Sequence, residues 1–176
     1  MISMKVQKSN SKEIPVQKTN ALRLLDKLKI PYRTYLYDAP DGFLDGVSVA
    51  EAIGLDPSIV FKTLVLQGTS RLYYVCLVPV AMELDLKKAA KYFGEKKLDM
   101  IPAKEITTVT GYIKGGCSPV GMKKPFPTAV DQSAANHDKI VVSAGRVGLQ
   151  MELSVDGLLG AVGAGLVDLK VDGIEV

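Results

Sequence analysis

The sequence of 176 residues contains only one histidine, His137, and two cysteines, Cys76 and Cys117. A structural zinc site needs four Cys or His ligands, and these three scattered residues cannot supply them. Two cysteines make no disulfide framework in a chain of this length, which indicates a reducing compartment such as the cytoplasm. We therefore expect no zinc site, no other bound metal or cofactor, and no disulfide scaffold.

Several other signatures are absent. No run of about 18 apolar residues occurs, which argues against a membrane span, and the polar N-terminus lacks the apolar core of a signal peptide. The phosphate-binding pattern Gly-x-x-x-x-Gly-Lys-Ser/Thr is missing, and "GAVGAG" at 160–165 does not match the dinucleotide fingerprint. The net charge of +3 is too small by itself to indicate a non-specific nucleic-acid binder.

The composition indicates one soluble globular domain. Hydrophobic residues make up 47% of the chain and charged residues 23%. Residues 1–17 are mixed and polar, so we predict a flexible leader there and an ordered domain at 18–173.

Hydrophobic periodicity and capping residues predict the elements. The 19–30 helix has Thr19 or Asn20 as its cap and an apolar face that includes Leu28, and a capping box from Ser48 to Glu51 opens the 48–54 helix. Further helices are predicted at 85–94, 102–109 and 154–162, and strands at 32–37, 58–66, 72–80, 96–100, 127–131, 139–144 and 148–153. Short strands mixed with irregularly placed helices predict the α+β class, with a curved, mostly antiparallel or mixed sheet.

Lys62 interrupts the apolar strand "SIVFKTLVL" at 58–66. Both faces of this strand are mainly apolar, and burying an unpaired ammonium is costly. Either the strand lies at an edge, where Lys62 reaches solvent along its apolar stem, or Lys62 opens onto a cavity. The residues alone leave both alternatives open.

The segment "TGYIKGGCSPVG" at 110–121 is a second candidate feature. Gly115, Gly116 and Pro119 define a bend at which a ligand can approach the main chain, and exposed amides can bind an anion or a developing oxyanion. The same glycines also suit an ordinary tight connection. Lys123 and Lys124 follow in "GMKKPFP"; such a pair is usually solvated but can also meet phosphate.

A nucleophilic mechanism based on a histidine would have to use His137 with Cys117 or Ser118. No arrangement of base and nucleophile is visible in the sequence. The simpler interpretation is that His137 lies in an exposed turn and that Cys117 is a small packing residue.

Taken together, four segments resemble the YbaK family of aminoacyl-tRNA deacylases, and most closely its branch that acts on Cys-tRNA(Pro). They are "VFKTLVL", "VPVAMELDLKKAAKYFGEKKLDM", "TGYIKGGCSPVGMKKPFPTAVD" and "VSAGRVGLQMEL". The resemblance extends from about Thr19 to about Asp172. It implies a curved mixed sheet with a barrel-like core and a cavity for the aminoacylated 3′ end of tRNA.

The resemblance also implies a function in translation fidelity. Such proteins are trans-editing factors, which clear tRNA(Pro) that prolyl-tRNA synthetase has mischarged with cysteine. A size-based synthetase pocket discriminates poorly between near-isosteres, so a second hydrolytic site is physically sensible. The modest net charge favours a tRNA choice that depends on a transient complex with the synthetase.

The family's site residues fall on named positions of this chain. By resemblance the catalytic set is Lys62, Gly115 and Gly116, and the substrate-binding set is Tyr37, Phe43, Thr63, Ser118, Pro119, Ser143 and Gln150. Relatives commonly carry an aspartate at the position of Gln150, which here offers only a neutral amide, so the fine amino-acid preference stays open.

The mechanism implied by the branch needs no protein nucleophile, because the substrate's own thiol attacks its ester carbonyl and releases a cyclic thioester. Under this interpretation Lys62 faces a ligand cavity.

Two alternatives stay open: a deacylase that clears another small residue, such as alanine, with activated water, and a non-catalytic module that binds charged tRNA or a synthetase.

Overall fold

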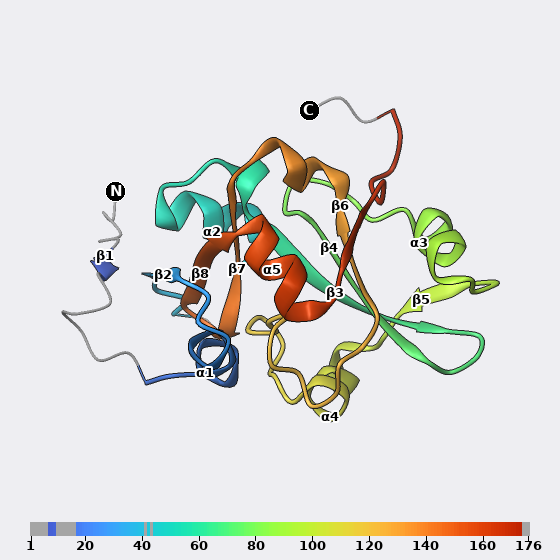
Figure 1. Ribbon diagram of the computed structural model, residues 1–176, viewed down its shortest axis with the longest axis horizontal. Coiled ribbons are helices and arrows are strands. Elements are labelled where there is room, and N and C mark those ends of the chain that lie inside the picture. Colours follow the sequence, from blue (N-terminus) through green and yellow to red (C-terminus); the bar gives the residue numbers. More distant parts are fainter. Residues whose placement is uncertain (1–6, 10–16, 41, 43, 174–176) are drawn as a thin grey trace.

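The computed structural model describes residues 7–9, 17–40, 42 and 44–173. Its described part contains five α-helices and nine strands (Figure 1). The helices are α1 Asn20–Lys27, α2 Gly46–Ile53, α3 Leu86–Phe93, α4 Ile106–Thr110 and α5 Val155–Val162. The strands are β1 Gln7–Ser9, β2 Tyr32–Leu36, β3 Phe61–Gly68, β4 Tyr73–Pro79, β5 Leu98–Met100, β6 Thr128–Asp131, β7 Lys139–Arg146, β8 Leu149–Ser154 and β9 Gly165–Val167.

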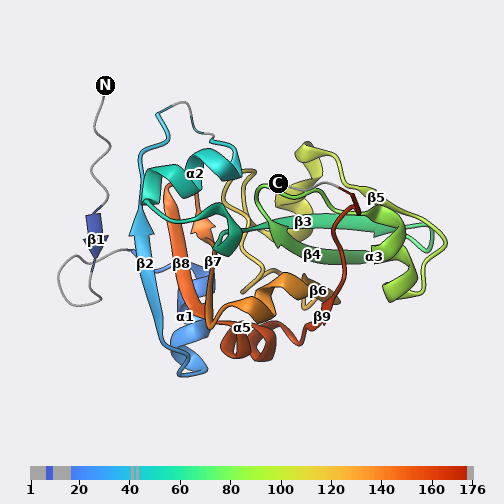
Figure 2. The same cartoon turned by 90° about the horizontal axis from the view of Figure 1, so that it is seen from above.

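The strands form two sheets that lie side by side (Figure 2). The first sheet has the order β1-β2-β8-β7 and is antiparallel throughout. The second has the order β5-β3-β4-β6-β9 and is mixed, because β4, β6 and β9 run parallel while β5, β3 and β4 alternate in direction. The α+β class predicted from the sequence is confirmed.

The strand arrangement differs from the single curved sheet that the sequence predicts. The two sheets meet through one isolated parallel bridge between Val60 and Val141, at the start of β3. Beyond that bridge β3 diverges from β7, and β5 pairs with β3 only from Leu66 to Gly68. Residues 61–64 of β3 therefore have a paired strand on the β4 side only, since the Val65 carbonyl already accepts from the Ile101 amide on the β5 side. A cavity lies along this interruption of the sheet.

The helix caps agree with the sequence analysis except at α2. Thr19 caps α1 by accepting from the Leu22 amide, and Gly54 ends α2 in the left-handed conformation. The predicted capping box from Ser48 is wrong, because Asp45 is the cap of α2 and accepts from the Ser48 amide. Leu28 does not join the apolar face of α1; it follows the last helical turn and is 46% exposed.

The described residues form three hydrophobic core clusters. The largest packs α1 and α5 against β4, β6, β7 and β8, together with Tyr112 and Val120 of the segment between α4 and β6. A second cluster packs α3 against β3, β4 and β6. The third packs α2 against Val60, Val80 and Val141, where the two sheets meet. The bridge between the sheets is thus held by its own apolar cluster.

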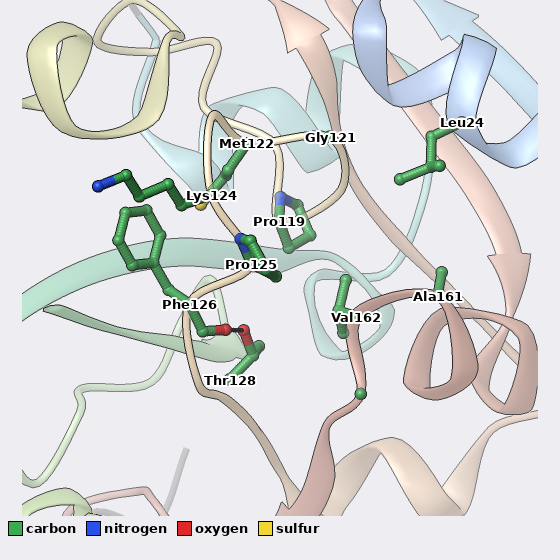
Figure 3. Close-up of a pocket in the computed structure, with 11 residues that line it drawn as sticks. Leu24, Pro119, Gly121, Met122, Lys124, Pro125, Phe126, Thr128, Ala161 and Val162 are labelled. Carbon is green, nitrogen blue, oxygen red and sulfur yellow. Dashed lines mark hydrogen bonds between the residues drawn. The ribbon is translucent and has the colours of Figure 1, made fainter.

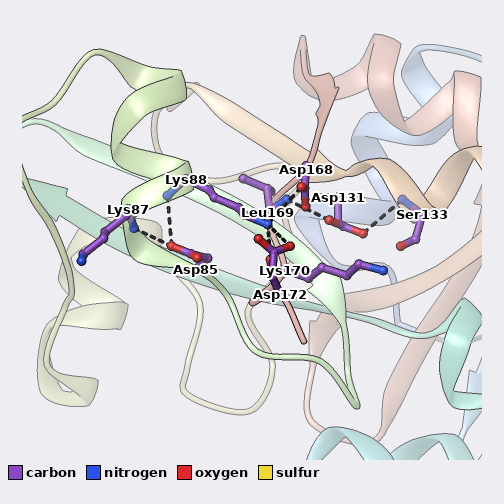
Figure 4. A network of polar contacts seen from close by, with 9 residues as sticks. All are labelled: Asp85, Lys87, Lys88, Asp131, Ser133, Asp168, Leu169, Lys170 and Asp172. Carbon is purple, nitrogen blue, oxygen red and sulfur yellow. Dashed lines mark hydrogen bonds and ion pairs between the residues drawn. The ribbon is translucent and has the colours of Figure 1, made fainter. Parts of the chain in front are cut away.

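The C-terminal segment is fastened to α3 and β6 by polar contacts (Figure 4). The Lys88 ammonium donates to Asp168 Oδ2, to the Lys170 carbonyl and to Asp172 Oδ1, at 3.0, 2.8 and 2.7 Å. The buried Asp131 carboxylate accepts from the Leu169 amide at 2.9 Å. This explains a structural role for the "LDLKKAAK" segment, which contains Lys88.

Of the predicted leader, the structure describes residues 7–9 and residue 17. Residues 7–9 form β1, which pairs with β2. The rest of that segment lies outside the described residues, so the flexible leader stays a prediction. Among the helices described, none is both long enough and apolar enough to span a bilayer.

Candidate functional site

A cavity of about 430 Å³ lies where β3 diverges from the first sheet. Its wall is formed by α2 with the residues that precede it, by β3 and by the start of α4. Residues of β7 and β8 in the first sheet also line it, as do residues of the 110–121 segment, which we call the glycine segment. The lining residues are Tyr37, Leu44, Asp45, Gly46, Val47, Val49, Val60, Phe61, Lys62, Thr63, Leu64, Val80, Ile106, Lys114, Gly115, Cys117, Ser143 and Gln150. The volume and the mainly apolar wall with a few polar groups are typical of a small-molecule site.

Lys62 lines this cavity and lies opposite Val78 of β4 in the strand register. Burial lowers the pKa of the Lys62 ammonium, and the negative charge of Glu83 opposes that shift only in part. No ion pair involving Lys62 occurs among the described residues. The structure combines the two alternatives left open by the sequence: Lys62 lies on an unpaired edge of β3, and that edge borders the cavity. Lys62 is thus a partly desolvated cation beside space that a ligand can fill.

Neutral polar groups complete the wall. Ser143 of β7 and Gln150 of β8 are register partners across the first sheet, and both line the cavity. Gln150 is only 6% exposed although its side chain is polar. Thr63 Oγ1 is buried without a hydrogen-bond partner in the described part of the chain. Buried polar atoms normally have partners, so the Thr63 hydroxyl is suited to a ligand that supplies one. The Ser143 hydroxyl already accepts from the Gly145 amide at 3.3 Å.

The glycine segment brings main-chain groups to the same cavity. Gly115 lines it and has a φ of 84°, in the left-handed region that favours glycine. The neighbouring Lys114 also lines it, which adds a second cationic side chain. The Tyr112 hydroxyl donates to the Val120 carbonyl at 2.6 Å, a bond that ties one end of the segment to the other. The Gly115 backbone therefore lies in a turn that this hydrogen bond stabilises.

Gly116 does not line the cavity, although the resemblance assigns it to the catalytic set. Its amide already donates to the Ile113 carbonyl at 3.0 Å, so it is not available to a substrate oxygen. A Cβ at this position would lie 2.8 Å from the Val147 amide nitrogen, which shows that the turn packs directly on the β7–β8 connection. Close packing on this connection therefore favours glycine at position 116.

Two further predicted residues lie away from this cavity, and one cannot be placed. Ser118 is fully buried, and its hydroxyl accepts from the Val120 amide, which shapes the turn. Pro119 lines a different pocket, on the other side of the segment. Phe43 lies outside the described residues. Of the predicted site residues, the structure brings together Tyr37, Lys62, Thr63, Gly115, Ser143 and Gln150.

The arrangement offers little support for a protein nucleophile. Cys117 lines the cavity, but burial raises the pKa of its thiol to about 11, which keeps it protonated near neutral pH. Its thiol donates to Thr110 Oγ1 at 3.8 Å, and His137 is not among the described residues that line the cavity. Within the described ranges, no group of three or more His, Cys, Asp or Glu side chains could hold a metal ion.

Sequence reasoning missed several residues of the wall, most notably Asp45, Val80, Ile106 and Lys114. Lys114 directly precedes Gly115, so its proximity could have been read from the sequence. The other three come from distant segments, and no periodic signal in the sequence marks them.

Comparison with known proteins gives consistent results. The family model for the aminoacyl-tRNA editing domain matches residues 45–161. A candidate Cys-tRNA(Pro)/Cys-tRNA(Cys) deacylase of Enterococcus faecalis, EbsC, is 45% identical over 143 residues, which cover 81% of this chain and 87% of that protein.

Two solved structures share the fold. The crystal structure of a candidate trans-editing enzyme for prolyl-tRNA synthetase is 24% identical, with a TM-score of 0.74, and the match covers 89% of this chain and 99% of that one. The crystal structure of a protein described only as hypothetical is 21% identical, with a TM-score of 0.78, and the match covers 87% of this chain and 100% of that one.

Proposed function

Because the chain belongs to the aminoacyl-tRNA editing domain family, we propose that it deacylates mischarged Cys-tRNA(Pro) in the cavity that contains Lys62. The observation that carries this proposal is the desolvated Lys62 ammonium beside Gly115, Ser143 and Gln150 in one cavity. The deacylase to which the chain is 45% identical bears a name that includes both Cys-tRNA(Pro) and Cys-tRNA(Cys), so cysteine is the acyl group that we favour.

The reaction uses the substrate's own thiol. The thiol sulfur bonds to the ester carbonyl carbon, the bond from that carbon to the ribose oxygen breaks, and the thiol proton ends on the ribose hydroxyl of the released tRNA. The other product is a cyclic thioester of cysteine. This pathway needs no protein nucleophile, which accords with the raised pKa of the Cys117 thiol.

The protein contributes positioning and charge in this mechanism. Lys62 binds the ester region or the adjoining nucleotide, and the Gly115 amide faces the carbonyl oxygen as negative charge develops on it. Thr63 and Gln150 supply hydrogen bonds that hold the acyl group. Fixing the thiol near its own ester restricts the substrate to reactive geometries, which can lower the barrier by several kcal/mol.

The test is deacylation by the purified full chain of tRNA(Pro) charged with cysteine, alanine or proline. We expect rapid loss of the cysteine ester and persistence of the other two. Equal loss of alanine would favour hydrolysis by activated water, because alanine has no thiol. If all three esters persist while charged tRNA binds, the chain is a binding module and the catalytic proposal fails.

We also propose that the choice of tRNA depends on a transient complex with prolyl-tRNA synthetase. A net charge of +3 provides little phosphate neutralisation for a protein that would act alone on tRNA. Synthetase added to the same assay should increase the rate of deacylation of Cys-tRNA(Pro) more than that of Cys-tRNA(Cys). Identical rates on both tRNAs with and without the synthetase would argue against the complex.

A further inference from the structure

Lys62 carries a primary amine inside the cavity in which the proposed reaction takes place. The residue is partly buried and lines a space of about 430 Å³. Among the described residues its ammonium has neither an ion pair nor a hydrogen bond. A desolvated lysine whose proton no acceptor holds is a nucleophile as well as a charge.

Other charged groups lie near this amine, but none pairs with it in the described part of the chain. Asp45 and Lys114 line the same cavity, and the charge of Glu83 acts on Lys62 from the segment after β4. The Asp45 carboxylate accepts from the amide and the hydroxyl of Ser48 at 2.9 and 3.0 Å. Burial has the largest effect on Lys62 and lowers the pKa of its ammonium. The neutral amine is therefore more available than that of a lysine in water.

The other nucleophilic groups of the cavity are less suited to keeping an acyl group. Burial raises the pKa of the Cys117 thiol to about 11, and this thiol donates to Thr110 Oγ1. A thiol that attacks a thioester also forms only another thioester, so that exchange is reversible. The hydroxyls of Thr63 and Ser143 have no histidine beside them among the residues that line the cavity. An amine forms an amide, which persists.

The proposed reaction supplies an acylating agent in the same space. Its product is a cyclic thioester of cysteine, and a thioester in a small strained ring reacts readily with amines. We infer that Lys62 is a site of acylation by small thioesters, and that the cyclic thioester released in the cavity is the reagent that modifies it. The second half of this inference rests on the proposed function, because only that reaction forms the product.

The modification is a simple acyl transfer. The nitrogen of the neutral Lys62 amine bonds to the carbonyl carbon, the bond from that carbon to the ring sulfur breaks, and a proton passes from the nitrogen to the sulfur. The result is an amide between Lys62 and cysteine, with a free thiol and a free amino group. No oxidant or further reactant is needed. The amide nitrogen is uncharged, so each adduct removes the cation that the proposed mechanism uses.

Two nearby lysines provide internal comparisons. Lys114 lines the same cavity but is exposed to water. Lys124 lines a second pocket of about 340 Å³, and in Figure 3 its side chain points away from Ala161 and Val162. It is also exposed. Water solvates both ammonium groups, which favours the charged, non-nucleophilic form. Selective acylation of Lys62 would therefore reflect its burial in the cavity and not its mere position beside a pocket.

The first experiment follows the full chain through many turnovers of Cys-tRNA(Pro). Mass spectrometry of the intact chain should show an adduct with the mass of one cysteinyl residue, and peptide mapping should place it on Lys62. The fraction of deacylase activity lost should equal the fraction of chain acylated. Incubation with Pro-tRNA(Pro) should leave no adduct. Equal adducts on Lys62, Lys114 and Lys96 would overturn the inference, because a product that has left the cavity reacts with exposed lysines as well.

The second experiment tests the amine without tRNA. Homocysteine thiolactone, a stable cyclic thioester one methylene larger, should acylate Lys62 faster than Lys96, Lys114 or Lys124. Deacylase activity should fall as Lys62 is acylated. Lys62→Arg keeps a positive charge but replaces the amine with a guanidinium that stays protonated. In this control no adduct should form at position 62, and the exposed lysines should react at the parental rate.

The outcomes separate this inference from the proposed function. If the chain deacylates nothing but homocysteine thiolactone still selects Lys62, the proposed function fails and the acylation site stands. If deacylation is confirmed but Lys62 reacts no faster than Lys96, the inference is overturned. Selective reaction with homocysteine thiolactone, but no adduct after confirmed turnover, would show that the product leaves before it reacts and would overturn its assignment as the reagent.

Discussion

Replacement of Lys62 by methionine should reduce the deacylation of Cys-tRNA(Pro) by a factor of at least about 100. This is the range found when one charge-stabilising donor is removed from an active site. Methionine keeps an unbranched side chain in the wall of the cavity but has no charge. The loss should therefore come from the missing ammonium and not from a change in cavity shape.

The stability of this variant separates function from folding. Burial lowers the pKa of the Lys62 ammonium, which means that its charged form is destabilised in the free protein. Methionine removes that destabilisation, and the melting temperature of Lys62→Met should equal or exceed that of the parent. Lys96→Met, at an exposed position, is the matched control. A folded Lys62→Met protein that deacylates at the parental rate would contradict the assignment of Lys62.

Gly116→Ala should lower both stability and activity, although Gly116 does not line the cavity. A Cβ there would lie 2.8 Å from the Val147 amide nitrogen and 2.9 Å from the Arg146 carbonyl carbon. These are backbone atoms and cannot rotate aside, so the turn must shift. We expect a loss of about 1–3 kcal/mol in the free energy of unfolding, as for other overpacked sites.

The shift should also move Gly115, and a displacement of about 1 Å can cost up to a hundredfold in rate. Thermal melts and deacylation assays, made well below the melting temperature, measure the two effects separately. Gly160→Ala is the control, because nothing lies within 4 Å of a Cβ at that helical position. Parental stability and rate in Gly116→Ala would show that the turn is not held against the β7–β8 connection.

Local signals in the sequence predicted most elements of the fold. The cap at Thr19, the glycine stop at Gly54 and the apolar runs of β3 and β4 are properties of short segments, and the structure confirms them. The cap of α2 was missed because Ser48 followed by Glu51 fits a capping box, while Asp45 lies earlier in a loop with no apolar periodicity. Leu28 was assigned to the apolar face because helical periodicity does not reveal where the last turn ends.

The division into two sheets could not be predicted from local pattern. It depends on where β3 leaves β7, and only the tertiary contact of Val60 with Val141 determines that point. For the same reason, the sequence predicted only part of the candidate site. Lys62 and Gly115 carry visible local signals, but Ile106 and Val80 reach the cavity only through the fold. Ser118 and Pro119 share the glycine segment, yet the turn directs them away from that cavity.

The most direct test of the proposed mechanism compares Cys-tRNA(Pro) with the same tRNA charged with S-methylcysteine, using the unmodified full chain. The two esters differ by one methyl group on the sulfur, and only cysteine has a free thiol that can attack its own carbonyl. We predict rapid loss of the cysteine ester with formation of the cyclic thioester, and no loss of the S-methyl ester above the spontaneous rate. Loss of both esters at the same rate would show that water, and not the substrate thiol, is the nucleophile.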